Sequence, residues 1–215
     1  MADTKISGLS AVTTPADADE LAVNQAGASK KVTLNQLTAY FEQRGRQTNA
    51  SVANQTPTGG TDTYITGSDV TIPAGRLQAK SMYRLKFDLV KTSTAGTASV
   101  VLNVRIGTAG TTSDASRAVI TFAVQTAVAD EGAVDLNVVF RSVGSGTSAV
   151  IQALGMLDHR QQITGLTSVN TSIQKVTSSG FDSTVAGLKI GCSVNIGTST
   201  TGSLSLVQAE LFNLA

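Results

Sequence analysis

The residues suited to acid–base chemistry are few in this chain. Its single histidine, His159, stands between Asp158 and Arg160 at the end of an expected strand over 149–157. A histidine beside a carboxylate can act as a general base. The same triplet is also typical of a solvent-exposed turn without a catalytic role, and we favour this second interpretation.

The single cysteine, Cys192, excludes an internal disulfide and a thiolate zinc cage. It falls on the apolar side of an alternating segment, where a thiol behaves as a small buried hydrophobic group. Pairing of Cys192 with His159 as nucleophile and base is therefore disfavoured. We predict that the chain has no catalytic residue and is not an enzyme.

Three acidic residues, Asp130, Glu131 and Asp135, gather near one expected turn, and their oxygens suit Ca²⁺. They lack the dense acidic alternation of a dedicated calcium loop, so a charged turn is favoured. Asp114 follows the glycine-containing stretch 107–110, but no helix follows that stretch as a phosphate-binding loop requires. We predict no metal and no cofactor.

The composition excludes two classes of partner. The 215 residues carry a net charge of +1, with 14% charged residues, which gives no basic face for nucleic acid. The apolar run at 118–124 is far shorter than the roughly 20 residues that cross a bilayer. The first residues, MADTKISGLSAVTT, lack the apolar stretch of a secretory signal, so we expect neither a membrane nor export.

Residues 62–215 alternate between apolar and polar with a period of two. Tyr83–Leu89 is one clear example, and glycine-containing turns separate the segments. About eight such strands without an intervening helix predict an all-β protein, an antiparallel β-sandwich. Long connections and the missing Cys–Trp–Cys pattern favour a jelly roll over an immunoglobulin fold.

The first 45 residues have a different pattern. Glu20–Gln25 and Lys30–Thr33 flank the small turn Ala26–Ser29, which predicts a hairpin. Thr33 and Gln36 have the spacing of a capping box, so a short helix is expected to begin here.

One face of that helix is apolar, and Gly45 is its expected end. A unit of fewer than about 40 residues cannot bury such a face alone. It either packs on its own sandwich or docks on another chain, and we favour docking. The apolar face consists of Leu34, Leu37, Tyr40 and Phe41.

Residues 46–61 are rich in Asn, Gln, Thr and Gly and show no apolar period. They predict a polar linker that spans up to about 50 Å when extended. A swapped arm along a neighbouring subunit is the alternative. The expected domains are therefore 1–45, 46–61 and 62–215.

Four short motifs resemble the N-terminal segment shared by many virion structural proteins of tailed bacteriophages, both head fibres and tail fibres. The motifs are Lys5–Leu9, Thr13–Thr14, Asp19–Val23 with Gln25 and Gly27, and Lys30–Thr33. The stretches Lys91–Thr97 and Arg105–Gly110 look like parts of the jelly-roll heads of such proteins.

This resemblance implies a homotrimer, assembled in the bacterial cytoplasm, with its N-terminus anchored on the virion and its sandwich exposed. The implied docking partner is the major capsid protein or another virion protein. The docking residues expected on this hypothesis are Ile6, Leu9, Leu21, Val23, Val32, Leu34, Leu37, Tyr40 and Phe41.

Three functions remain as alternatives to a capsid decoration or head-fibre protein. A tail fibre or receptor-binding adhesin has the same anchor and adds a host-surface glycan as partner. A carbohydrate-binding module needs an export signal and exposed aromatics, but Tyr64 and Tyr83 are the only aromatic candidates near the sandwich and there is no Trp. A cupin-like enzyme needs several histidines around a metal.

Overall fold

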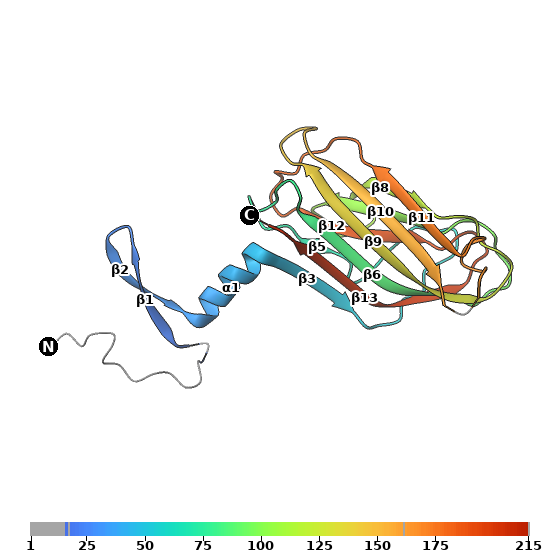
Figure 1. Cartoon of the computed structure of the whole chain (residues 1–215), viewed down its shortest axis with the longest axis horizontal. Coiled ribbons are helices and arrows are strands. Elements are labelled where there is room, and N and C mark those ends of the chain that lie inside the picture. The colour runs from blue at the N-terminus through green and yellow to red at the C-terminus, as the bar shows by residue number, and fades with distance from the viewer. Residues whose placement is uncertain (1–15, 17, 161, 215) are drawn as a thin grey trace. The chain divides into compact units, whose positions relative to one another are not determined.

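A computed structural model describes residues 16, 18–160 and 162–214 (Figure 1). The chain forms two compact units, Met1–Gln43 and Arg44–Ala215. The expected residues Ile6 and Leu9 lie outside the described residues. No helix in the described part of the chain has the length and apolar character needed to cross a membrane.

The first unit contains a hairpin and most of a helix. Strands β1 (Glu20–Gln25) and β2 (Ala28–Thr33) pair antiparallel, and α1 (Leu34–Gly45) follows directly. The two-residue turn has Ala26 at φ 52° and Gly27 at φ 81°. Positive φ at both positions matches the twist of a tight hairpin, so β2 begins two residues earlier than the sequence predicts.

The capping box at the start of α1 is confirmed. The backbone N–H of Gln36 donates to Thr33 Oγ1 at 3.1 Å, and the N–H of Thr33 donates to Gln36 Oε1 at 3.0 Å. Two N–H groups near the start of the helix thereby gain side-chain acceptors.

The second unit is built on a six-stranded antiparallel sheet, with the order β11-β10-β9-β6-β13-β3 (Figure 1). Its members in chain order are β3 (Arg46–Ser51), β6 (Met82–Lys91), β9 (Asp130–Ser142), β10 (Val150–His159), β11 (Thr171–Thr177) and β13 (Gly202–Phe212).

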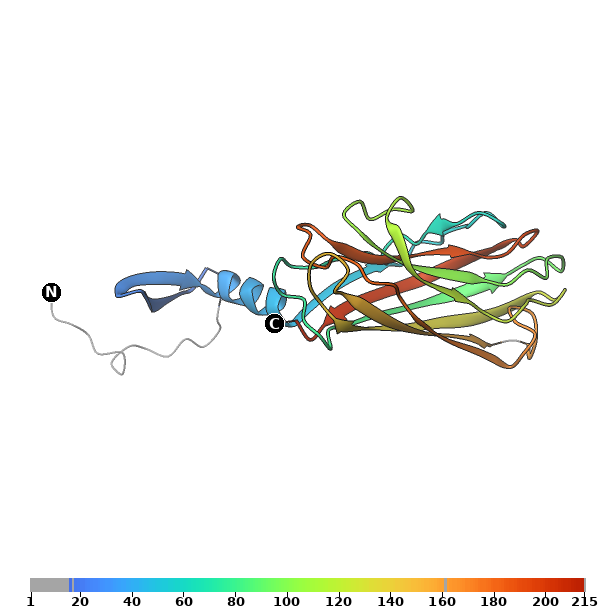
Figure 2. The same ribbon diagram turned by 90° about the horizontal axis from the view of Figure 1, so that it is seen from above.

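A five-stranded antiparallel sheet packs against it, and Figure 2 shows the two layers edge-on. Its order is β4-β12-β7-β8, with β5 also paired to β12. Its members are β4 (Thr63–Tyr64), β5 (Val70–Thr71), β7 (Val101–Gly107), β8 (Ala115–Thr121) and β12 (Lys189–Asn195).

Alternate residues of both sheets fill one core between the layers. Tyr83, Leu85, Phe87 and Leu89 on β6 are each at most 1% exposed, as their period of two requires. The prediction of an all-β antiparallel sandwich preceded by a hairpin and a helix is confirmed. The jelly-roll type stays a prediction.

The linker prediction is wrong for its first six residues, because Arg46–Ser51 is strand β3. It pairs with β13 along its length, from Arg46 opposite Phe212 to Ser51 opposite Val207. In this structure β3 and its partner β13 belong to the same chain. Main-chain hydrogen bonds hold this edge strand, so its side chains can be polar and leave no hydrophobic pattern.

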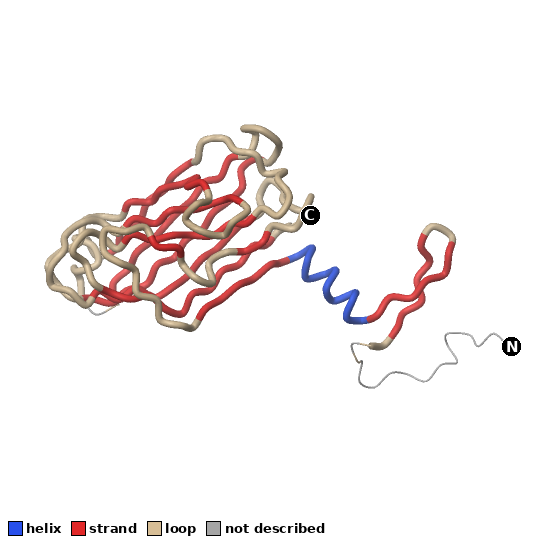
Figure 3. The backbone as a smooth tube through the Cα atoms, turned by 180° about the vertical axis from the view of Figure 1, so that it is seen from behind, coloured by secondary structure: helices blue, strands red, loops and turns tan. Residues whose placement is uncertain are grey.

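The sandwich has two ends, at which its loops gather (Figure 3). At the entry end, Arg46 of β3 lies opposite Phe212, and the chain arrives there from α1. At the far end, Lys91 of β6 lies opposite Asp130 of β9. The loops at these two ends contain the polar clusters described next.

Candidate functional site

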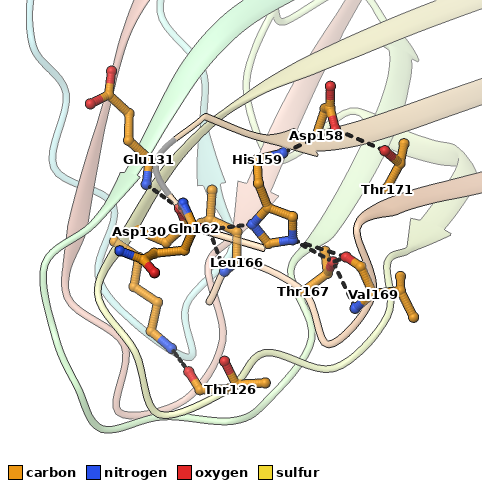
Figure 4. A network of polar contacts seen from close by, with 11 residues as sticks. Thr126, Asp130, Glu131, Asp158, His159, Gln162, Leu166, Thr167, Val169 and Thr171 are labelled. Carbon is orange, nitrogen blue, oxygen red and sulfur yellow. Dashed lines mark hydrogen bonds and ion pairs between the residues drawn. The ribbon is translucent and has the colours of Figure 1, made fainter. Parts of the chain in front are cut away.

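A buried polar network lies at the far end of the sandwich and is centred on His159 (Figure 4). The His159 side chain is 4% exposed, and its Nδ1 contacts the carboxylate of Asp130 rather than that of Asp158. Its Nε2 lies 2.9 Å from the carbonyl oxygen of Val169 and 3.1 Å from Thr167 Oγ1. The prediction of a solvent-exposed turn is wrong, because the His159 side chain is buried and contacts Asp130 on strand β9.

Backbone N–H groups around Asp130 provide hydrogen-bond donors for its buried carboxylate. Its carboxylate accepts hydrogen bonds from the N–H groups of Glu131 at 2.8 Å, Gln162 at 3.2 Å and Leu166 at 3.1 Å. With His159, these donors offset the cost of burying a carboxylate away from water. The segment after β10 is thereby fixed to the start of β9.

Lys91 lies beside this network, opposite Asp130 in the pairing of β6 with β9. Its ammonium group donates to the carbonyl oxygens of Gly96, at 2.9 Å, and of Thr126. Burial lowers the pKa of Lys91, and the nearby charge of Asp130 acts in the opposite direction. We call Lys91, Asp130 and His159 the far-end clasp, since together they hold the loops that follow β6, β8 and β10.

The far-end clasp is unsuited to general base catalysis. One ring nitrogen of His159 faces Asp130 and the other faces the carbonyl of Val169. A general base needs a nitrogen lone pair within reach of a substrate proton. Both nitrogens are already engaged, so the geometry supports a structural role.

The acidic residues near this end do not converge. Asp130 points into the core, whereas Asp135 lies on the outer face, with Lys86 Nζ 3.4 Å from its Oδ1. Within residues 16, 18–160 and 162–214, no three His, Cys, Asp or Glu side chains gather as metal ligands would.

Cys192 lies in the core, 0% exposed, and its backbone N–H donates to Ser68 Oγ at 3.0 Å. Burial raises the pKa of its thiol to about 12. A thiol with this pKa carries almost no thiolate near neutral pH, so Cys192 is not a nucleophile.

The expected docking residues on the hairpin share one face. Leu21 and Val23 are 45% and 40% exposed, and the register places half-buried Val32 opposite Leu21. Glu20 and Lys31 form an ion pair at 2.5 Å, and period two places both on the other face. The hairpin therefore has an apolar face and a charged face.

The expected docking residues on α1 are partly accessible. Leu34 and Leu37 are half-buried, and Tyr40 is 45% exposed. For Phe41 the structure describes the backbone alone, within α1. No described side chain from residue 16 to Gly45 is buried, so the hairpin and helix do not form a hydrophobic core from their described residues.

The sequence contained a signal for the far-end clasp that the pattern analysis missed. Lys91 continues the buried series of β6, and Asp130 and His159 have the same relation to the buried residues of β9 and β10. Charged or titratable residues at three strand ends, each in phase with the core, indicate a buried network.

Comparison with known proteins adds little. No family model matches the chain, and no curated protein matches it. Among solved structures, a protein of unknown function from Shewanella oneidensis MR-1 aligns with 84% of this chain and 93% of its own, at 12% sequence identity and a TM-score of 0.29. A likeness at this TM-score supports no conclusion about fold or function.

Proposed function

We propose that the chain is a non-enzymatic structural component of a tailed-phage virion. In this proposal it is a homotrimeric capsid decoration or head-fibre protein, anchored by its N-terminal unit with the sandwich exposed. The motifs within residues 5–33 that resemble phage virion anchors suggest the class of particle.

One structural observation carries the docking part of the proposal. The buried hydrophobic residues of the described chain begin at Ile65, so the hairpin and helix contribute none of them. Burial of a Leu or Val side chain against a partner contributes about 1.5–3 kcal/mol. Docking of Leu21, Val23 and Tyr40 on a virion protein would supply hydrophobic burial, which the described side chains of the hairpin and helix lack.

Trimerisation would strengthen such an anchor. Three copies of a weak contact bind together far more tightly than one, because the second and third contacts form at high effective concentration. Cyclic symmetry would also close the assembly and prevent open-ended growth. Light scattering of the full chain at micromolar concentration is expected to give the mass of a trimer, and a monomer would contradict this part.

The anchor is tested by aspartate substitutions on the two faces of β1. Leu21→Asp with Val23→Asp places charge on the apolar face, whereas Ala22→Asp places it on the charged face of the same strand. We expect the double variant to be lost from purified particles and the control to be retained. Retention of both variants would contradict the docking role.

Electron microscopy of labelled particles distinguishes the capsid from the tail. Density at threefold or quasi-threefold positions of the capsid is the expected result. Density at the tail would instead support the tail-fibre alternative, with the same N-terminal anchor.

A further inference from the structure

A cavity of about 340 Å³ opens at the entry end of the sandwich. One wall is the loop between β7 and β8, and the other is the segment 178–188 that precedes β12. Its volume is near the lower limit for small-molecule sites, roughly 300–1,000 Å³. Its polar lining comprises Thr108, Ser113, Asp114, Arg117 and Asp182.

Arg117 occupies an irregular position on β8. The register shifts so that Arg105 lies opposite Ser116 and Val104 opposite Ala118, which leaves Arg117 as the extra residue of a β-bulge. Bulges redirect a side chain, and the guanidinium carbon of Arg117 lies 5.2 Å from the centre of the Phe181 ring.

The guanidinium of Arg117 has no polar partner within the described chain. Its Nε is buried without a hydrogen bond, and no ion pair involves its terminal nitrogens. By contrast, Arg105 binds Asp62 and Arg160 binds Asp88. A half-buried cation without an acceptor is costly, and such groups call for a ligand or ion that satisfies them.

The two acids that line the cavity are already engaged elsewhere. Asp114 accepts hydrogen bonds from the N–H groups of Ala109 at 3.0 Å and Gly110 at 2.7 Å. Asp182 accepts from Thr184, through its N–H at 2.8 Å and its hydroxyl at 2.7 Å, which lowers the pKa of Asp182. Neither carboxylate forms an ion pair with Arg117.

Hydrogen bonds fix both walls of the cavity. Arg105 donates to the carbonyl oxygens of Thr112 at 2.7 Å and Asp114 at 2.5 Å, which holds the β7–β8 loop. On the other wall, Phe181 pairs with Ala149 in an isolated antiparallel bridge. A preformed site loses little entropy on binding.

We propose that this cavity binds a small hydroxylated carboxylate, of the class of the sugar acids. The guanidinium of Arg117, stacked on Phe181, binds the carboxylate of the ligand, because its planar N–H donors match the two oxygens of a carboxylate. The hydroxyls of Thr108 and Ser113 and the carboxylate of Asp182 receive the hydroxyl groups of the ligand. This site is independent of the N-terminal anchor, and the virion proposal does not depend on it.

The test is a calorimetric titration of the full chain with glucuronate, and with glucose as the matched neutral sugar. We expect glucuronate to bind with a Kd of about 1 mM or tighter and glucose to bind at least about tenfold more weakly. Equal binding of the two sugars, or binding of neither, would overturn the proposal.

Variants assign the binding to the cavity. Arg117→Gln is expected to weaken glucuronate binding at least about tenfold, while Arg141→Gln, at an exposed arginine of β9, leaves it unchanged. Val185→Trp fills the cavity with Arg117 intact and is expected to abolish binding. If Arg117→Gln does not fold, the Val185→Trp result decides, and full binding by that variant would overturn the proposal.

Discussion

His159, at the last position of β10, contacts the carboxylate of Asp130, 29 residues earlier, at the first position of β9. Neither side chain is more than 4% exposed. The contact joins two strands that are neighbours in the sheet and fixes the loop that follows His159. The far end of the sandwich therefore depends on a polar contact where an apolar one would be usual.

Asp130→Asn is expected to destabilise the protein by about 3–5 kcal/mol, because it leaves His159 buried without its carboxylate partner and removes the negative charge near Lys91. Urea unfolding at neutral pH measures the change. The matched control is Asp135→Asn on the same strand, whose ion pair with Lys86 is largely exposed and is expected to contribute less than about 1 kcal/mol. Similar losses for both variants would contradict a structural role of the far-end clasp.

Gly67→Ala tests the packing of β3 on the sandwich. Gly67 has φ +86°, and an added Cβ would lie 2.7 Å from backbone atoms of Ala50 and Ser51. We expect a loss of about 2–4 kcal/mol by thermal unfolding, from strain and displacement of β3. Gly75→Ala has a similar φ of +69° but open space around it, so it is expected to lose only about 1 kcal/mol.

Two N-terminal deletions test whether Arg46–Ser51 is a strand of the sandwich or part of a linker. The fragment 44–215 retains β3 and is expected to unfold cooperatively, with stability close to that of the sandwich in the full chain. The fragment 54–215 lacks β3, which exposes the backbone of β13 and costs about 3 kcal/mol or more. Equal melting temperatures for the two fragments would restore the linker interpretation.

Alkaline pH is expected to destabilise the fold through Cys192. The pKa of Cys192 in the folded protein, about 12, exceeds that of an exposed thiol. The contribution of the protonated thiol to the free energy of unfolding is therefore fully present below about pH 9 and is lost as pH rises toward 12. As pH rises from 9 to 11, the free energy of unfolding of the wild type is expected to fall by about 2 kcal/mol more than that of Cys192→Ala. Denaturant unfolding at both pH values measures this difference.

Two other groups titrate in the same direction. Burial raises the pKa of Tyr64 and of Tyr83, and the neighbouring Cys192 raises both pKa values further. The difference between the wild type and the variant therefore reports the thiol together with its coupling to these two tyrosines. Parallel stability curves for the wild type and the variant would show that the thiol is not shielded.

The strands of the sandwich could be predicted because burial on one side imposes alternation on the sequence. Tyr83–Leu89 follows that pattern, and the structure buries its core-phase residues. The hairpin turn and the capping box could be predicted because local chemistry determines them, as with Gly27 and Thr33. Both kinds of signal lie within a few neighbouring residues.

Other features could not be predicted because they depend on pairing between distant segments. β3 is polar, and its partner β13 lies at the opposite end of the sequence. Arg117 has no distinctive neighbours in the sequence, and its position over Phe181 arises from a bulge and a crossing between strands. The contact of His159 with Asp130 could not be predicted either, although the sequence places His159 in phase with the buried residues of β10.

The direction in which β3 enters the sandwich determines how the protein resists mechanical tension. Six residue pairs join β3 to β13, from Arg46 at the entry end to Ser51. A pull on Gly45 along the strand axis loads these pairs in shear, all at once, instead of peeling them apart one by one. Rupture then requires several hydrogen bonds to break together, so this short polar strand can act as a mechanical clamp.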